Sequence, residues 1–225
     1  MLVVRGLRRV PFTLVMLLGI GTVGVLSGSA ANEVSPEVLS RCGFALRDLW
    51  QGTWYSLVTE VWFTHSAFMY WGILGFVVLS IGAYEWRAGT RRSLLLYWLT
   101  DIGGTLIVTL CFVLPLYLAK TDLGLTLAFS DDVGMSGGGF GSIGGSVHLL
   151  SLPLRRWAFA GVLIYLVMHL VIVTDLSSDI LHIVTFLMGF WLDGQLSSQF
   201  EKSNRGEVKP RLSQTETKPD RDWPN

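Results

Sequence analysis

The sequence is poor in charged residues. Only 15% of its 225 residues are Asp, Glu, Lys or Arg, and its 17 basic residues are balanced by 17 acidic ones. Soluble domains carry about 25% charged residues, so this composition falls outside that class. A chain without net charge has no overall field that would attract a polyanion, and we therefore expect no nucleic-acid partner. We also find no internal repeat.

Cysteine is scarce as well. Cys42 lies in a predicted loop and Cys111 inside an apolar segment, so we expect no disulfide framework. Three histidines in apolar segments, His148, His169 and His182, are the only basis for a haem or metal site. No ligand motif surrounds them, and we expect no metal and no cofactor.

The sequence is rich in long apolar segments. Hydrophobic residues make up 51% of the chain, and the mean hydropathy is +0.50. A membrane-spanning helix needs about 20 apolar residues. Six candidate segments can be drawn, at 10–28, 66–84, 93–119, 133–150, 157–174 and 179–193. The fourth and sixth are short and broken by small or polar residues, which a helical bundle tolerates. The prediction is an all-α membrane protein of six transmembrane helices with a short, Gly-rich fourth helix at its centre.

Basic residues cluster in alternate loops. They precede the first segment and follow the second and fourth: Arg5, Arg8, Arg9, Arg87, Arg91, Arg92, Arg155 and Arg156. The intervening loops are acidic or neutral, with Asp122, Asp131, Asp132, Asp175 and Asp179. Because cytoplasmic loops collect Lys and Arg, both termini are predicted to be cytoplasmic in a multi-pass integral membrane protein.

This topology divides the chain into a first transmembrane helix (1–28), an outer loop (29–65), a membrane core (66–194) and a polar cytoplasmic tail (195–225). The tail is predicted to be disordered. The first segment has a second interpretation, because its Arg-rich start, apolar run and Ser-Gly-Ser-Ala-Ala at 27–31 resemble a cleavable signal peptide. Cleavage would leave five spans in the same orientation.

A serine and a histidine are predicted at matching depths. Ser136 follows Asp132 by four residues and His182 follows Asp179 by three, which places both just inside the outer face. Serine attacks a carbonyl when a base, usually His, removes its proton, and the carbonyl then needs donors for its negative charge. Backbone N–H groups at a helix N-terminus supply such donors. Ser136 and His182 are therefore predicted to be nucleophile and base.

Glycines surround this serine. Gly134 and Gly137 allow a substrate backbone to approach closely. Gly137, Gly141 and Gly145 are spaced by four and form a smooth face on which a neighbouring helix can pack.

Taken together, residues 54–194 resemble the rhomboid family of intramembrane serine proteases. That family carries Gly-x-Ser-Gly at the start of its fourth helix, with an aromatic residue four positions after the serine and a glycine next to it. The matching residues are Gly134, Ser136, Gly137, Phe140 and Gly141. Its sixth helix carries a His followed seven positions later by Gly, which matches His182 and Gly189. The segment 85–92 resembles the family's turn between the second and third helices.

The resemblance implies an activity and a set of site residues. Ser136 and His182 would cleave transmembrane protein substrates near the outer face of the bilayer, without a cofactor, in what the family resemblance implies is a bacterial inner membrane. Residues near the oxyanion or the substrate would be Gly134, Met135, Gly137, Tyr70 and Phe140.

Several positions depart from the family pattern. Rhomboids take oxyanion donors from a His and an Asn on the second helix, and these places fall at Tyr70 and Leu74 here. The Tyr70 hydroxyl is the one side-chain donor expected there. The family's Trp-Arg pair is matched by Trp62 and then Phe63, and its small residues beside the helix-six His are replaced by Leu181 and Thr185. The alternative function is therefore a catalytically inactive rhomboid-like protein that binds membrane proteins.

Other polar residues lie near the predicted spans. Asp101 is predicted to form a structural ion pair with Arg91 or Arg92. His169 is predicted to hydrogen-bond between helices, or to be a second partner for Ser136. His65 would orient the outer loop or assist the site. The outer loop also contains three tryptophans typical of an element at the membrane interface: Trp50, Trp54 and Trp62.

Overall fold

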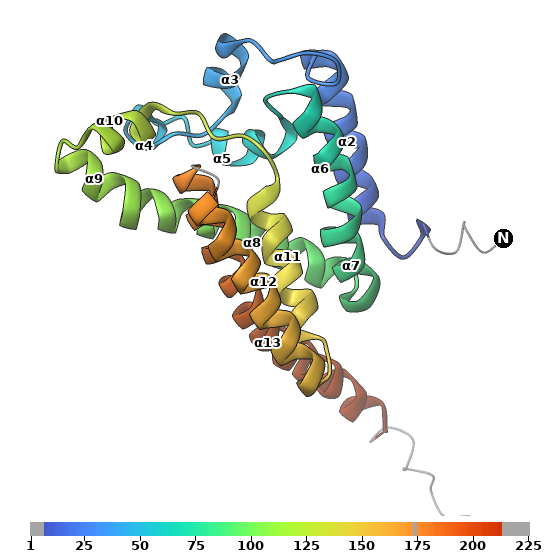
Figure 1. The fold of residues 1–225 in the computed structure, drawn as a ribbon. Helices are drawn as coiled ribbons and strands as arrows, with labels where there is room; N and C mark the ends of the chain where they lie inside the picture. The colour runs from blue at the N-terminus through green and yellow to red at the C-terminus, as the bar shows by residue number, and fades with distance from the viewer. Residues whose placement is uncertain (1–6, 173–174, 213–225) are drawn as a thin grey trace, which may run out of the picture.

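The structure, a computed structural model, describes residues 7–172 and 175–212 (Figure 1). Regular structure in these residues is helical, and they contain no β-strand. Four helical rods are long and apolar enough to cross a membrane: Ala67–Ala88, Thr90–Leu118, Leu152–Ile172 and Leu176–Phe200. Length and composition of this kind indicate an integral, multi-pass membrane protein. The predicted all-α fold class is confirmed.

Each of the six predicted apolar segments contains a helix. The first two rods each include a π-helical turn: α6 (Ala67–Val77), η2 (Val78–Gly82) and α7 (Ala83–Ala88), then α8 (Thr90–Val108), η3 (Thr109–Val113) and α9 (Leu114–Leu118). The other two rods are α12 (Leu152–Ile172) and α13 (Leu176–Leu212). Two shorter helices complete the bundle, α2 (Pro11–Ser27) and α11 (Ser136–His148).

The short helix α11 lies inside the bundle, packed between α8 and α13 (Figure 1). Its glycines permit this position. A Cβ at Gly141 would collide with Thr100 of α8, and a Cβ at Gly144 would overlap the backbone of Phe186 in α13. Gly189 of α13 in turn meets the backbone of Gly141. The predicted glycine face is therefore a real packing surface, and the contact of Gly144 with α13 adjoins it.

The first helix is docked to the bundle by a buried carboxylate. Glu85, at 0% exposure, accepts hydrogen bonds from the N–H groups of Phe12 and Thr13 at 2.9 and 2.8 Å and from the Thr13 hydroxyl at 2.7 Å. Met16 and Ile20 are fully buried in the same core. Removal of α2 would leave the Glu85 carboxylate buried without these donors, which is a costly state. This packing favours a retained helix over a cleaved signal peptide.

Short helices close one end of the bundle, and we call residues 29–65 and 119–135 the cap. The cap contains α3 (Pro36–Cys42), α4 (Leu46–Gln51), α5 (Ser56–Thr59), η1 (Glu60–Trp62) and α10 (Asp122–Phe129). Its two parts are joined by the backbone pairing of Phe44 with Asp132 and by an ion pair between Arg47 and Asp131. Trp50 and Trp54 are exposed on it, whereas Trp62 packs against Gly19 of α2.

A buried aspartate ties four helices together at the opposite end. Asp193 of α13 accepts hydrogen bonds from the Tyr84 hydroxyl and, at 2.8 Å, from Nε of Arg92, and it pairs with Nδ1 of His148 at 3.0 Å. Arg155 also bonds the carbonyl of His148. The arginine-bearing turns after α7 and α11 therefore meet at the end remote from the cap, as the charge pattern predicts.

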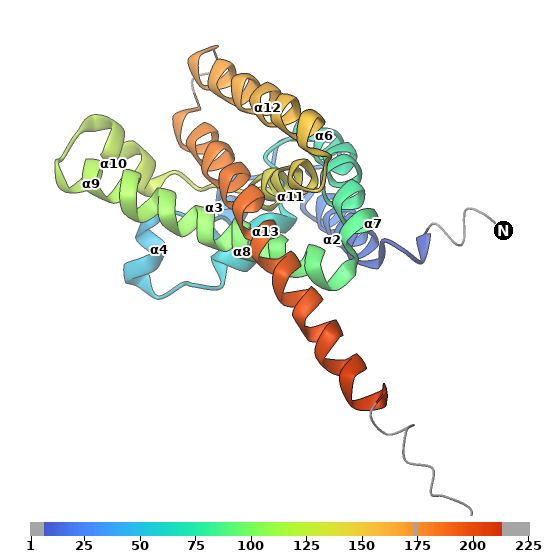
Figure 2. The same ribbon diagram turned by 90° about the horizontal axis from the view of Figure 1, so that it is seen from below.

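The last helix is longer than the sequence suggests. Disorder is predicted from residue 195, but α13 continues as helix to Leu212, beyond the rest of the bundle (Figure 2). The described helix thus includes 195–212 of the predicted tail, and 213–225 lie outside the described residues. The Ser197 hydroxyl bonds both the Asp193 carbonyl and Arg92, and extending an existing helix costs little compared with starting one.

Helix α12 lies at the edge of the bundle, against α13 and α11 (Figure 2). Leu166 is its one buried residue, while Trp157, Ile164 and Val171 are exposed. An apolar helix with so much exposed surface suits contact with lipid.

Candidate active site

Ser136 and His182 meet. Ser136 is the first residue of α11, and its Oγ lies 2.9 Å from Nε2 of His182, the seventh residue of α13. This is hydrogen-bond distance for a hydroxyl and an imidazole nitrogen, and it is the geometry that a serine and its general base require. The close approach of α11 and α13 at Gly144 and Gly189 brings the two residues together.

Phe140 holds the imidazole from the side. Its ring lies 4.4 Å from the His182 ring, centroid to centroid, and 5.2 Å from the ring of Phe76 in α6. Phe140 is one turn after Ser136 on the same helix, so it faces the same direction. The residue, predicted to lie near the oxyanion or the substrate, thus packs against the predicted base.

The chain enters α11 through a tight turn. Gly134 has φ of +123°, a conformation that side chains disfavour, and its N–H donates to the Glu60 carbonyl at 3.0 Å. Met135 follows it and is fully buried. In the first turn, the N–H of Gly138 donates to Asp101, whereas no described residue accepts from the N–H of Ser136 or Gly137. Those two donors remain available beside the serine.

Asp101 has a different partner from the predicted one. Its Oδ1 accepts the Gly138 N–H at 2.7 Å, so it caps α11 from the neighbouring helix α8. The predicted ion pair with Arg91 or Arg92 is wrong, since Arg92 bonds Asp193 instead. The carboxylate is buried, and its Oδ2 has no hydrogen-bond partner among the described residues.

Tyr70 faces away from Ser136. Its hydroxyl donates to the Gly21 carbonyl of α2 at 3.4 Å, and its ring fills the space over Gly24. Leu74, the other position considered for an oxyanion donor, is apolar. In this geometry α6 supplies no side-chain donor to the serine, and the free N–H groups of α11 are left for that role.

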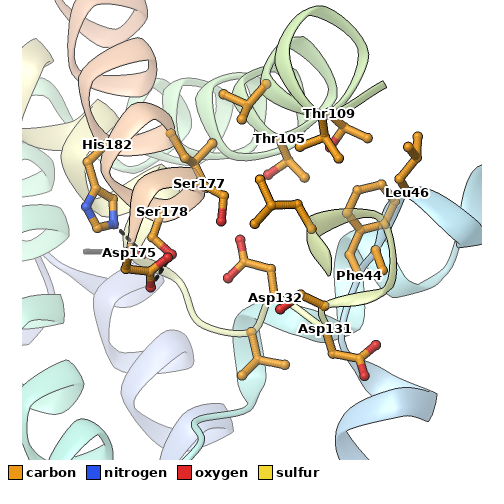
Figure 3. A pocket seen from close by; sticks show the side chains of 18 of the residues that line it. Phe44, Leu46, Thr105, Thr109, Asp131, Asp132, Asp175, Ser177, Ser178 and His182 are labelled. Atoms are coloured by element: carbon orange, nitrogen blue, oxygen red, sulfur yellow. Dashed lines mark hydrogen bonds between the residues drawn. The ribbon is translucent and has the colours of Figure 1, made fainter. Parts of the chain in front are cut away.

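A cavity of about 350 Å³ reaches Ser136 and His182 from the cap end. We call it the outer cavity. Its wall includes Phe44, His65, Thr105, Asp132, Asp175 and Ser178. Asp132 points into the cavity toward Ser177, whereas Asp131 is turned toward Arg47 (Figure 3). The carboxylates and hydroxyls in its wall make this cavity suitable for water.

Carboxylates give the outer cavity a negative character. Burial and the nearby charge of Asp175 raise the pKa of Asp132 to about 6. Behind the cavity wall, burial and then the charges of Asp132, Asp101 and Asp48 raise the pKa of Glu60 well above its ordinary range. Burial is the main cause of both shifts, and the neighbouring carboxylates add to it. Asp132 and Asp175 were placed at the outer face from the sequence, but their convergence on one cavity was not predicted.

A second, smaller pocket of about 250 Å³ reaches the same two residues from the side. We call it the lateral pocket. It lies between α6, α11 and α12, and its wall is mostly apolar: Phe76, Ser136, Phe140, Tyr165, Leu166, His169 and His182. Ser136 and His182 therefore lie where the outer cavity and the mostly apolar lateral pocket meet.

His169 makes the predicted bond between helices. Its Nδ1 lies 2.6 Å from Oδ1 of Asp179, which joins α12 to the start of α13. Ser136 bonds His182 and not His169. His65 lines the outer cavity. The role of Asp179 was missed, although its position one turn before His182 and close in sequence to His169 was a signal for it.

The described residues contain no group of three or more His, Cys, Asp or Glu side chains arranged to hold a metal ion. No family model matches the chain, and no curated protein or solved structure matches it either.

Proposed function

We propose that this protein is a rhomboid-like intramembrane serine protease that uses Ser136 and His182 as a catalytic dyad. The observation that carries the proposal is the 2.9 Å contact between Ser136 Oγ and His182 Nε2 at the junction of the outer cavity and the lateral pocket. The substrate is a transmembrane protein segment in the same bilayer. The topology has six membrane helices, both termini in the cytoplasm and the cap outside, in a bacterial inner membrane.

The reaction divides between the two residues. His182 takes the Ser136 proton while Oγ attacks a backbone carbonyl of the substrate. The N–H groups of Ser136 and Gly137, at the positive end of α11, stabilise the negative charge on the carbonyl oxygen. The new N-terminus leaves with the proton from His182, and water from the outer cavity then hydrolyses the acyl-enzyme. No cofactor takes part.

The two cavities support separate routes for the two reactants. The lateral pocket opens beside α12, the least buried of the four long apolar helices, so a membrane-embedded segment can approach from lipid. The outer cavity has carboxylates and hydroxyls in its wall and suits water. A bilayer excludes water, so a hydrolase there needs such a polar path.

A second candidate function is a catalytically inactive protein that binds membrane proteins. One observation favours it: the Asp101 carboxylate occupies the Gly138 N–H, so a negative group lies at the end of α11 where the oxyanion would form. Like charge at that place opposes the transition state. Because the Tyr70 hydroxyl is bonded to α2, backbone N–H groups alone would have to stabilise the oxyanion against this charge.

A small fluorophosphonate probe separates the two functions. The protease should be labelled in detergent at Ser136, and Ser136→Ala and His182→Ala should each abolish labelling, because the hydroxyl is a weak nucleophile without its base. Ser146→Ala, which removes a serine elsewhere on α11, is the control and should be labelled like the wild type. Labelling that persists in Ser136→Ala, or no labelling of the folded wild type, would contradict the protease function and favour the binding protein.

A further inference from the structure

The lateral pocket contains a polar side chain for which the proposed reaction has no use. Apart from Ser136 and His182, the wall is apolar except for Tyr165 and His169. A histidine in an otherwise apolar wall loses hydration unless it finds a partner. His169 has one partner, Asp179, which bonds one of its two ring nitrogens and leaves the other free.

Asp179 fixes which nitrogen is free. Its carboxylate lies 2.6 Å from Nδ1 of His169 and is only 2% exposed. A carboxylate can only accept, so Nδ1 carries the proton, and in the neutral ring Nε2 is left as an acceptor. No described residue bonds Nε2 of His169. The pair therefore holds the imidazole of His169, a residue of the lateral-pocket wall, in one orientation with an unused acceptor.

The substrate of the proposed reaction supplies a matching donor. A transmembrane segment arrives as a helix, whose carbonyls are already bonded and cannot reach Ser136. To present a carbonyl it must unwind, and each unwound turn frees backbone N–H groups in apolar surroundings, where an unpaired donor is costly. The freed N–H groups need acceptors within the protein.

We propose that His169, oriented by Asp179, accepts a hydrogen bond from a backbone N–H of the unwound substrate segment in the lateral pocket. The proposal rests on the proposed function. It makes His169 a substrate-binding residue, and Asp179 a positioning residue that acts through it. The recognised feature is the open backbone of the segment and not a particular side chain.

Two fluorophosphonates test the proposal. One is an ethyl fluorophosphonate without N–H groups, and the other carries an acetylated tetra-alanine peptide. In His169→Phe, which keeps a ring of similar shape, labelling of Ser136 by the peptidyl probe should slow by about 3- to 10-fold, the worth of one hydrogen bond. Labelling by the ethyl probe should keep its wild-type rate, because that probe has no backbone to bind.

A matched control removes a similar pair at the other end of the molecule. His148 bonds Asp193 at 3.0 Å, far from both cavities, and His148→Phe should leave the ratio of the two labelling rates at the wild-type value. Asp179→Leu should slow the peptidyl probe alone. If Asp179→Leu slows both probes, Asp179 acts on His182 and the proposal is overturned.

The remaining outcomes are also distinguishable. Equal peptidyl labelling of wild type and His169→Phe, or a wild type that reacts with the ethyl probe but never with the peptidyl one, overturns this proposal and leaves the protease intact. A folded wild type that reacts with neither probe overturns the protease, and the proposal with it. Thermal unfolding of each variant shows whether a slowed reaction reflects a misfolded protein.

Discussion

The two helices that flank the candidate site, α11 and α12, have opposite relations to their surroundings. α11 is short, rich in glycine and serine, and buried along eight of its 13 residues. α12 is long and apolar and has one buried residue, Leu166. By composition α12 is the better membrane helix. Yet α11 is the helix that packs at the centre.

The difference shows what each sequence is adapted to contact. Large apolar side chains on α12 suit lipid, which needs no shape complementarity. Glycines on α11 suit other backbones, because without a hydrophobic driving force helices in a membrane associate through close packing. The weak apolar signal of 133–150 therefore predicts a central position, where the neighbours supply what lipid cannot.

The largest difference between α11 and α12 is expected when one methyl group is added to each helix. In Gly144→Ala the new Cβ would overlap the backbone of Phe186, so α11 and α13 must separate. We expect a loss of at least about 3 kcal/mol of stability, the upper range for overpacking. In Gly161→Ala on α12 the Cβ meets nothing within 4 Å, and helix stability should rise by up to about 1 kcal/mol.

Thermal unfolding in detergent measures both changes. Equal midpoints for Gly144→Ala and Gly161→Ala would mean that the backbone contact between α11 and α13 does not hold the bundle together.

A second test concerns how α11 begins. Asp101→Leu leaves the Gly138 N–H buried without its acceptor, and we expect a loss of about 1–3 kcal/mol. Asp101→Asn keeps an oxygen acceptor and removes the charge, so its stability should stay near that of the wild type.

If the protease proposal holds, Asp101→Asn should also raise the rate of fluorophosphonate labelling at Ser136. Removing a charge interaction of about 1–2 kcal/mol corresponds to about 5- to 30-fold. Unchanged or slower labelling would show that the Asp101 charge does not oppose the oxyanion.

The smallest effect is expected in the loop that leads into α11. The pKa of Asp132 is raised to about 6 from an ordinary value of 3.8, so the folded state holds this proton more tightly than the unfolded state does. In acid, where Asp132 is protonated in both states, it does not lower the stability of the fold. As the pH rises from about 4 to about 6, ionisation of Asp132 increasingly destabilises the folded state.

Asp132→Asn removes the ionisable group and with it this destabilisation. We expect its Tm to exceed that of the wild type by about 2–5 °C at pH 7, with the difference shrinking as the pH falls toward 4. Asp175→Asn should give a weaker change of the same sign, because the Asp175 charge contributes to the shift. Parallel Tm curves of Asp132→Asn and wild type from pH 4 to 7 would contradict the prediction.

Features that depend on spacing along one helix could be predicted from the sequence. The depth of Ser136 and His182 follows from counting residues inward from charged loops, and the structure places the two in contact. The glycine face of α11 and the position of Phe140 follow from a period of four. These require only that each segment is a helix.

Features that depend on a distant partner could not be predicted. The direction of Tyr70 is decided by the space over Gly24 on α2, and no local pattern in α6 reveals that space. Arg92 bonds Asp193, 101 residues away, in preference to the nearby Asp101. The helical extension to Leu212 could not be predicted because the polar sequence from 195 onward resembles a disordered segment, whereas continuation from α13 decides its conformation.

The carboxylate of Glu85 also sets an order of events during synthesis. The backbone donors that it accepts at the start of α2 are made 73 and 72 residues before it. At about 5–20 residues per second, the first helix waits about 4–14 s for the group that anchors it. During that interval α2 has been synthesised but cannot yet pack against Glu85. It joins the bundle only when the second span has been made.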